Sequence, residues 1–161
     1  MEEILELKEC LLNRQYERAM TIVEELELMG RQDKINNLES FLVILLIHLI
    51  KIQVEKRVTR SWRSSIVNSF REIQKRNRLG NRSHYIKPNQ WNEHFKAIYA
   101  DAIFKAADET FGGIEITELK SLVDFNSLQN LALELLDLIY TLDADSIINL
   151  ICDRFPIGSL E

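Results

Sequence analysis

A run of basic side chains in the middle of the chain is the feature best suited to binding chemistry. These side chains recur at helical spacing and form what we call the basic face, which consists of Arg57, Arg60, Arg63, Arg71, Lys75, Arg78 and Arg82. Arginine dominates the set, and its planar guanidinium suits bidentate contacts with phosphate or carboxylate groups. The basic face therefore favours a surface for phosphate, nucleic acid or an acidic protein.

The distribution of charge allows a second interpretation of the same residues. The net charge is −5 for the whole chain, but residues 1–50 carry −5, residues 51–87 carry +9 and residues 88–161 carry −9. Basic elements placed between acidic ones can neutralise them within the fold. Because the chain as a whole is acidic, we weigh this neutralising role ahead of a binding role.

One histidine lies in the most apolar stretch of the chain. Residues 41–50 are all apolar except His48. Burial there should push the imidazole toward its neutral form, and both ring nitrogens would need partners. His48 is then either a tuned base or switch, or a core histidine bonded to a carboxylate or a backbone carbonyl. We favour the core histidine.

Signatures of catalysis and of metal binding are absent from the sequence. It contains no Gly-x-Ser-x-Gly, no P-loop and no Gly-x-Gly-x-x-Gly, and its histidines form no Glu-x-x-His or His-x-x-x-His pair. The two cysteines, Cys10 and Cys152, are 142 residues apart and fit no zinc spacing. Asp143 and Asp145 are better explained as helix caps than as cation ligands. We expect no enzyme activity, no metal and no cofactor.

The elements that position these residues should be helices. Hydrophobic residues make up 46% of the chain, and Gly (5) and Pro (2) are scarce, which argues against a turn-rich sandwich or barrel. Apolar residues recur every three or four positions, which predicts helices over 4–12, 16–29, 31–57, 61–78, 91–111, 118–123, 127–141 and 145–155.

Three further features refine this helical prediction. Asn13 should cap the second helix, and Gly30 should mark either a helix end or a close helix contact. Trp62 should point into the core while the basic face points outward. Residues 41–50 need cover on every side, either as the centre of a bundle or as the seam of a homodimer. We predict an all-α, single-domain bundle of six to eight helices around this central apolar helix.

Several strings in the sequence resemble the bacterial helical family catalogued as domain of unknown function 29. Residues 24–31 resemble its acidic helix end followed by Gly-Arg, and residues 45–53 are similar to its Leu-Leu-x-His-Leu-(Leu/Ile)-Lys segment. Residues 60–63 are similar to its Arg-Ser-Trp segment, and residues 99–102 and 107–110 to its later helix. The resemblance covers residues 5–112 and implies an all-helical fold and a bacterial, cyanobacterial source, without an established activity.

The resemblance also bears on domains and on His48. Residues 1–112 would be the family-like core, and residues 113–161 depart from the family pattern, so we expect them to form a helical extension packed on the same domain. Family-like strings contain the best candidate partners for His48, which gives a possible buried polar network of Glu24, Glu25, His48, Arg63 and Asp101. Such a network would fix the register of the helices.

These observations favour a non-catalytic interaction or regulatory module in the cytoplasm. It would dock a protein partner through the leucine-rich C-terminal helices or through the basic face, and it could form a homo-oligomer. The alternative is nucleic-acid binding through the arginine-rich residues 57–87. No membrane is expected, because the N-terminus is acidic and ten apolar residues span about 15 Å, half of a bilayer core.

Overall fold

The chain begins with a helical hairpin in the computed structural model, which describes residues 1–160. Helix α1 (Glu2–Leu12) is followed by the 40-residue helix α2 (Tyr16–Glu55). Gly30 lies within α2, so the helix end predicted there is wrong. The alternative of a close helix contact is wrong too, because a Cβ atom added at Gly30 would meet nothing within 4 Å. A single glycine weakens a helix by about 1 kcal/mol relative to alanine, which the remaining residues of α2 overcome.

Asn13 caps the end of α1 and does not begin α2, which corrects the sequence prediction. Its backbone N–H donates to the carbonyl oxygen of Glu9, and the N–H of the next residue, Arg14, donates to that of Leu11, as expected where a helix closes. Arg14 then adopts a left-handed φ of 60° and turns the chain, so α2 starts at Tyr16. Asn suits both ends of a helix, and the pattern alone did not separate the two positions.

The structure divides into two compact units, residues 1–36 and residues 37–160. The first unit, which we call the N-terminal hairpin, contains α1 and the start of α2. Its buried core consists of only Cys10, Ala19 and Ile22, with Leu7 and Leu26 packed partly against them. Arg18 donates a hydrogen bond to Glu6 across the hairpin.

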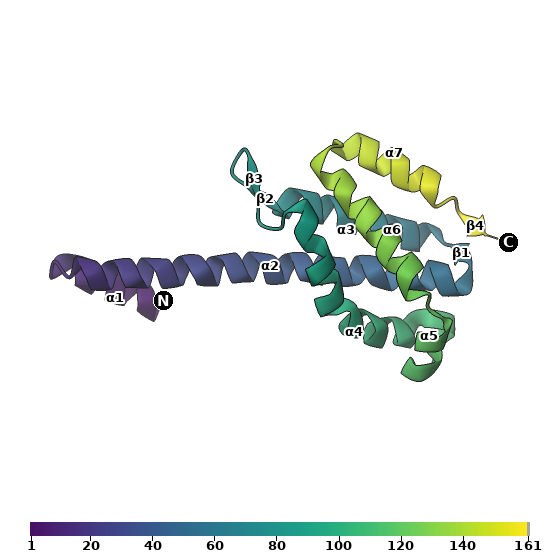
Figure 1. Ribbon diagram of the computed structural model, residues 1–161, viewed down its shortest axis with the longest axis horizontal. Coiled ribbons are helices and arrows are strands. Elements are labelled where there is room, and N and C mark those ends of the chain that lie inside the picture. The colour runs from purple at the N-terminus through teal and green to yellow at the C-terminus, as the bar shows by residue number, and fades with distance from the viewer. Residues whose placement is uncertain (161) are drawn as a thin grey trace. The chain divides into compact units, whose positions relative to one another are not determined.

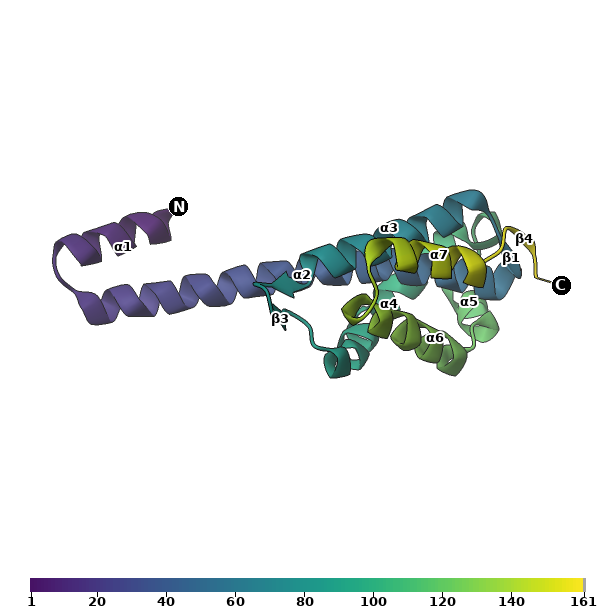
Figure 2. The same ribbon diagram turned by 90° about the horizontal axis from the view of Figure 1, so that it is seen from above.

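The second unit, which we call the body, contains the rest of α2 and five further α-helices (Figure 1, Figure 2). The helices are α3 (Arg60–Arg76), α4 (Trp91–Glu109), α5 (Ile116–Leu122), α6 (Phe125–Asp137) and α7 (Ala144–Arg154), with short 3-10 turns η1 (Pro88–Gln90), η2 (Thr110–Gly112) and η3 (Leu138–Tyr140). Helix α7 packs along α3, and α4 contacts both α5 and α6. Seven α-helices within residues 1–160 confirm the predicted all-α fold.

The body thus has six α-helices: its part of α2 and the five helices α3 to α7. The apolar residues 41–50 form its centre. Leu42, Leu45, Leu46 and Leu49 are almost completely buried there, and Ile44 is the exception with 39% of its surface exposed. The body itself therefore supplies most of the cover that this stretch needs, and a homodimer seam is not required to explain it.

Local capping signals set most of the helix starts in the body. The Thr59 side chain accepts from the backbone N–H of Trp62 and caps α3, and Asp143 caps α7 through Ser146. The cap at Asp143 was expected from the sequence. Helix α6 starts at Phe125, earlier than predicted, because Asp124 caps it and accepts from the backbone N–H of Ser127.

Two very short antiparallel strand pairs complete the body. Strand β1 (Arg57–Val58) pairs with β4 (Gly158–Ser159), and β2 (Arg78–Leu79) pairs with β3 (Ser83–His84). Strands of two residues are too short to produce an alternating pattern, so the sequence does not predict them. The first pair joins the C-terminal segment to the connection between α2 and α3.

A buried polar hub anchors the loop between α3 and α4. Asn77 is fully buried and exchanges two hydrogen bonds of 2.8 Å with the backbone of Ile86. The Tyr140 hydroxyl donates to the Ile86 carbonyl (2.6 Å) and accepts from Trp91 Nε1 (2.6 Å) and from Asn77 Nδ2 (3.2 Å). Residues from α3, α4, η3 and the intervening loop are thus joined at one point.

Helix α2 is long and apolar enough to cross a membrane, judged only by its length and composition. Within its most apolar window, 56% is buried inside the structure. A buried core helix of a soluble protein meets the same criteria.

Candidate functional site

The basic face is spread over several elements of the body. Arg60, Arg63, Arg71 and Lys75 lie on α3, whereas Arg57 is in β1, Arg78 in β2 and Arg82 in the turn between β2 and β3. All seven are exposed except the half-buried Arg63. The predicted outward orientation is therefore met, but helix α3 itself carries only part of the set.

Arg57 is engaged in contacts within the fold. Its Nε and Nη2 atoms donate to Glu55 Oε1 at 3.2 Å and 3.1 Å. Its guanidinium carbon also lies 4.8 Å from the ring centroid of Trp62. A cation placed over an indole is attracted by the negative face of the ring, so Arg57 stabilises the start of α3.

A group of polar and aromatic side chains meets at the C-terminal end of α2. We call it the Lys51 cluster, and it consists of His48, Lys51, Glu55, Arg57, Trp62 and Glu109. Lys51 is only 6% exposed, and its Nζ atom donates to Glu109 Oε1 at 3.0 Å. The same atom lies 4.8 Å from the ring centroid of Trp62, which is 8% exposed. A buried ammonium is tolerated here because a carboxylate and an aromatic face both stabilise its charge.

Glu55 extends this cluster toward the end of α4. Its side chain is 6% exposed, and its second oxygen accepts from the backbone N–H of Phe111 at 3.3 Å. Phe111 has a φ of 51°, a left-handed conformation that costs free energy for a residue with a side chain. The hydrogen bond from Phe111 to Glu55 helps to hold this turn.

His48 is neutral at physiological pH in this environment. Burial lowers the pKa of His48, and the nearby positive charge of Lys51 lowers it further, against the raising effects of its Ile44 hydrogen bond and of Glu109. The neutral ring donates from Nδ1 to the Ile44 carbonyl oxygen at 2.8 Å. This backbone contact agrees with a core histidine.

The buried network predicted around His48 is corrected by these positions. Glu24, Glu25 and Asp101 are exposed, and Asp101 pairs with Lys105 at 3.1 Å. Arg63 is half-buried, and no hydrogen bond joins it to His48 within residues 1–160. Because they are exposed, these carboxylates stay hydrated, and contact with a neutral imidazole would not lower their free energy.

The residues that lie near His48 in the structure were not among its predicted partners. Lys51 follows His48 by three positions, which places both on one side of a helix. Glu109 belongs to the family-like string at residues 107–110, and Trp62 to the string at 60–63. Three separate family-like strings therefore contribute to one cluster, a signal that was available in the sequence but does not by itself reveal which residues pair.

The leucine-rich C-terminal helices bury the side chains that were expected to dock a partner. Leu128, Leu135 and Leu136 are almost fully buried, and Leu131 is half-buried. The three buried leucines fill the core of the body, so docking through them would require the body to open.

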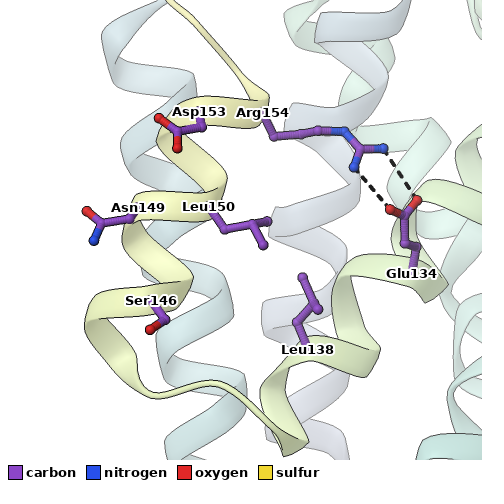
Figure 3. Close-up of a pocket in the computed structure, with 7 residues that line it drawn as sticks. All are labelled: Glu134, Leu138, Ser146, Asn149, Leu150, Asp153 and Arg154. Carbon is purple, nitrogen blue, oxygen red and sulfur yellow. Dashed lines mark hydrogen bonds and ion pairs between the residues drawn. The ribbon is translucent and has the colours of Figure 1, made fainter.

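A surface groove of about 630 Å³ lies between α6 and α7 (Figure 3). Arg154 reaches across it and donates two hydrogen bonds to Glu134, at 3.0 Å and 3.3 Å. Leu138 and Leu150 lie below this ion pair and point toward one another. The lining is mixed: Arg154 and Glu134 neutralise each other, and Asp153 adds a second acidic side chain.

Exposed large hydrophobic residues are concentrated in the N-terminal hairpin. Of the 16 large hydrophobic side chains that are exposed within residues 1–160, nine lie in its 36 residues. They are Met1, Ile4, Leu5, Leu11, Leu12, Tyr16, Met20, Leu28 and Met29. Monomeric proteins rarely expose a dense apolar surface of this kind, which marks interaction sites.

Metal ligands do not cluster in the part of the chain that the structure describes. Among residues 1–160, no group of three His, Cys, Asp or Glu side chains is placed to hold an ion. Both cysteines are free thiols.

A family model now identifies the family. The model described as Domain of unknown function DUF29 matches residues 9–132. The chain belongs to this family. No curated protein and no solved structure matches the chain. The DUF29 match takes in the Lys51 cluster and most of the N-terminal hairpin, and it runs 20 residues past the boundary at 112 that the motifs suggest, into α6.

Proposed function

We propose that this DUF29 protein is a non-catalytic interaction module that docks a protein partner through the N-terminal hairpin. The observation that carries the proposal is the concentration of exposed apolar side chains in residues 1–36. A two-helix hairpin with three buried core residues gains little stability from its own packing. A partner that covers Leu5, Leu12 and their neighbours would remove this surface from water.

The occupant that we propose is an amphipathic helical segment of another protein with basic residues beside its apolar face. Residues 1–36 contain nine acidic and five basic residues, a net charge of −4. A second copy of the hairpin would bring a like charge to the interface, which opposes self-association. A basic-flanked helix would match both the apolar surface and the charge.

The experiment compares two matched double variants of the full chain. Leu5→Gln/Leu12→Gln removes two exposed apolar side chains from the hairpin, and Phe104→Gln/Leu122→Gln removes two from the body. Both leave the charge unchanged. We expect a protein captured from the native cells by the wild type to be retained by the body variant and lost by the hairpin variant. The captured protein must then bind the chain directly when both are purified.

Two results would contradict the proposal. Equal capture by both variants would remove the hairpin as the docking surface. A wild-type dimer that becomes a monomer only in the hairpin variant, measured by light scattering, would show that a second copy covers the hairpin instead.

Nucleic-acid binding through residues 57–87 is the weaker alternative. The basic face is exposed, but Trp62 is buried and Arg57 is held by Glu55, so little remains for stacking against bases. Affinity for a 20-nucleotide DNA should fall steeply with salt if phosphates drive the contact. We propose the cytoplasm as the setting, which the two free thiols support.

A further inference from the structure

Three cations of the basic face form no close ion pair among the described residues 1–160. Arg71 and Lys75 are four residues apart on α3, which places them on one side of the helix, and Arg78 lies in β2, two residues after α3 ends. None of their side chains forms an ion pair or a hydrogen bond within residues 1–160, although the charges of Lys75 and Arg71 help to lower the pKa of Glu72. Three like charges near one another produce a concentrated positive potential.

These cations line a hollow, which we call the α3–α7 pocket. It has a volume of about 460 Å³ and is lined by Asn68, Arg71, Glu72, Gln74, Lys75, Arg78 and Ala144. Its volume lies within the range of about 300–1,000 Å³ that is usual for small-molecule sites. Ala144 is the first residue of the 11-residue helix α7.

The wall of the pocket is fixed by hydrogen bonds. Gln74 Nε2 donates to the carbonyl oxygens of Ile139 (2.9 Å) and Leu142 (2.7 Å), which ties α3 to the connection that leads into α7. The pocket therefore keeps its shape before a ligand arrives, which lowers the entropic cost of binding.

Among the residues that line the pocket, only Glu72 is acidic, and its negative charge is already offset. Glu72 accepts from Arg76 Nε at 2.7 Å, and this hydrogen bond lowers the pKa of Glu72. Arg76 contributes most to offsetting the negative charge of Glu72, with smaller contributions from Lys75 and Arg71. The three lining cations therefore outnumber the acidic charge and remain available to an anion.

We propose that the α3–α7 pocket binds a small molecule that carries a phosphate group. A phosphate dianion can accept bidentate hydrogen bonds from two arginines and a further one from a lysine, which a single carboxylate cannot do as fully. The pocket has no aromatic lining residue on which a base could stack. Its concave shape and the net acidic charge of the chain also disfavour an extended polyanion. This proposal does not rest on docking by the N-terminal hairpin.

The test is calorimetric titration of the full chain with three probes: inorganic phosphate, glycerol 3-phosphate and glycerol. The variant Arg71→Gln/Arg78→Gln removes two cations from the pocket. The matched control Arg60→Gln/Arg82→Gln removes two exposed cations of the basic face outside it. We expect saturable 1:1 binding of a phosphate probe that is at least about tenfold weaker in the pocket variant and unchanged in the control, with no binding of glycerol.

The same titrations can overturn the proposal. Absence of saturable binding by both phosphate probes would do so. An equal loss of affinity in the two variants would do so too, because it would report only the change in net charge. Tighter binding of a 20-nucleotide DNA than of glycerol 3-phosphate, with a steep salt dependence, would assign the cations to nucleic acid instead. Circular dichroism of both variants verifies that the helices are retained.

Discussion

Lys51 carries a charge in the interior of the body, and Glu109 is the carboxylate that compensates it. Replacing Glu109 with Gln leaves the ammonium without a counter-charge while Lys51 stays 6% exposed. Removing one partner of a fully buried pair costs about 3–5 kcal/mol, and because Glu109 is half-exposed we expect about 1–2 kcal/mol. Urea denaturation measures this loss.

The ion pair between Lys105 and Asp101 offers a matched control for Glu109→Gln. Both of its side chains are about half exposed. Asp101→Asn should change the free energy of unfolding by less than about 0.5 kcal/mol, since exposed pairs contribute little. Equal effects of the two substitutions would mean that burial of Lys51 does not make its counter-charge important.

His48 should make the stability of the body depend on pH. Burial lowers its pKa in the folded protein, so below the ordinary value of about 6.5 the unfolded chain binds a proton more readily. Stability from the neutral ring is fully present above that value and is lost as the pH falls through the folded pKa. Urea denaturation between pH 7.5 and 5 should therefore show a smaller loss of stability in His48→Gln than in the wild type. An identical pH dependence would contradict a buried, neutral His48.

At the scale of elements, the continuity of α2 makes a prediction about Gly30. Its backbone is helical and a Cβ atom there meets nothing, so Gly30→Ala should stabilise the helix by about 0.5–1 kcal/mol. Gly112, with a φ of +76°, is the control, and Gly112→Ala should destabilise by about 1 kcal/mol. Thermal unfolding followed by circular dichroism measures the sign of the stability change in both variants. Destabilisation by Gly30→Ala would indicate that α2 bends or is contacted there.

The hub around Tyr140 joins four elements through one hydroxyl. Tyr140→Phe removes the acceptor of Trp91 Nε1, whose ring is buried, and should cost about 1–3 kcal/mol. The control Tyr16→Phe removes a hydroxyl from a largely exposed side chain and should change stability by less than about 0.5 kcal/mol. Urea denaturation compares them, and a negligible cost for Tyr140→Phe would mean that water replaces the hydroxyl.

Features determined by neighbouring residues could be predicted from the sequence, and features determined by distant residues could not. The cap at Thr59 and the inward position of Trp62 follow from residues within one helical turn. The partner of Lys51 lies 58 residues away, and nothing in the helical pattern selects Glu109 from the other carboxylates. In the same way, the basic face is visible in the sequence, but the pocket beside Arg71 needs the start of α7 to close it.

At the scale of the whole molecule, the two units differ in how they use apolar residues. The body encloses the stretch at 41–50 and the leucines of α6. The N-terminal hairpin has three buried core residues and exposes nine large hydrophobic ones. A chain that buries so much in one unit and so little in the other is suited to a stable body that presents a surface for docking, which is the central claim of the proposed function.

Amide hydrogen exchange of the free chain and of its complex with the captured protein tests this claim most directly. In the free chain, residues 1–36 should exchange faster than the buried helices of the body, because few apolar contacts oppose local opening. In the complex, protection should rise in residues 1–36 and stay unchanged in α3 and α7. Protection that rises in α3 or α7 while residues 1–36 remain unaffected would contradict docking through the hairpin.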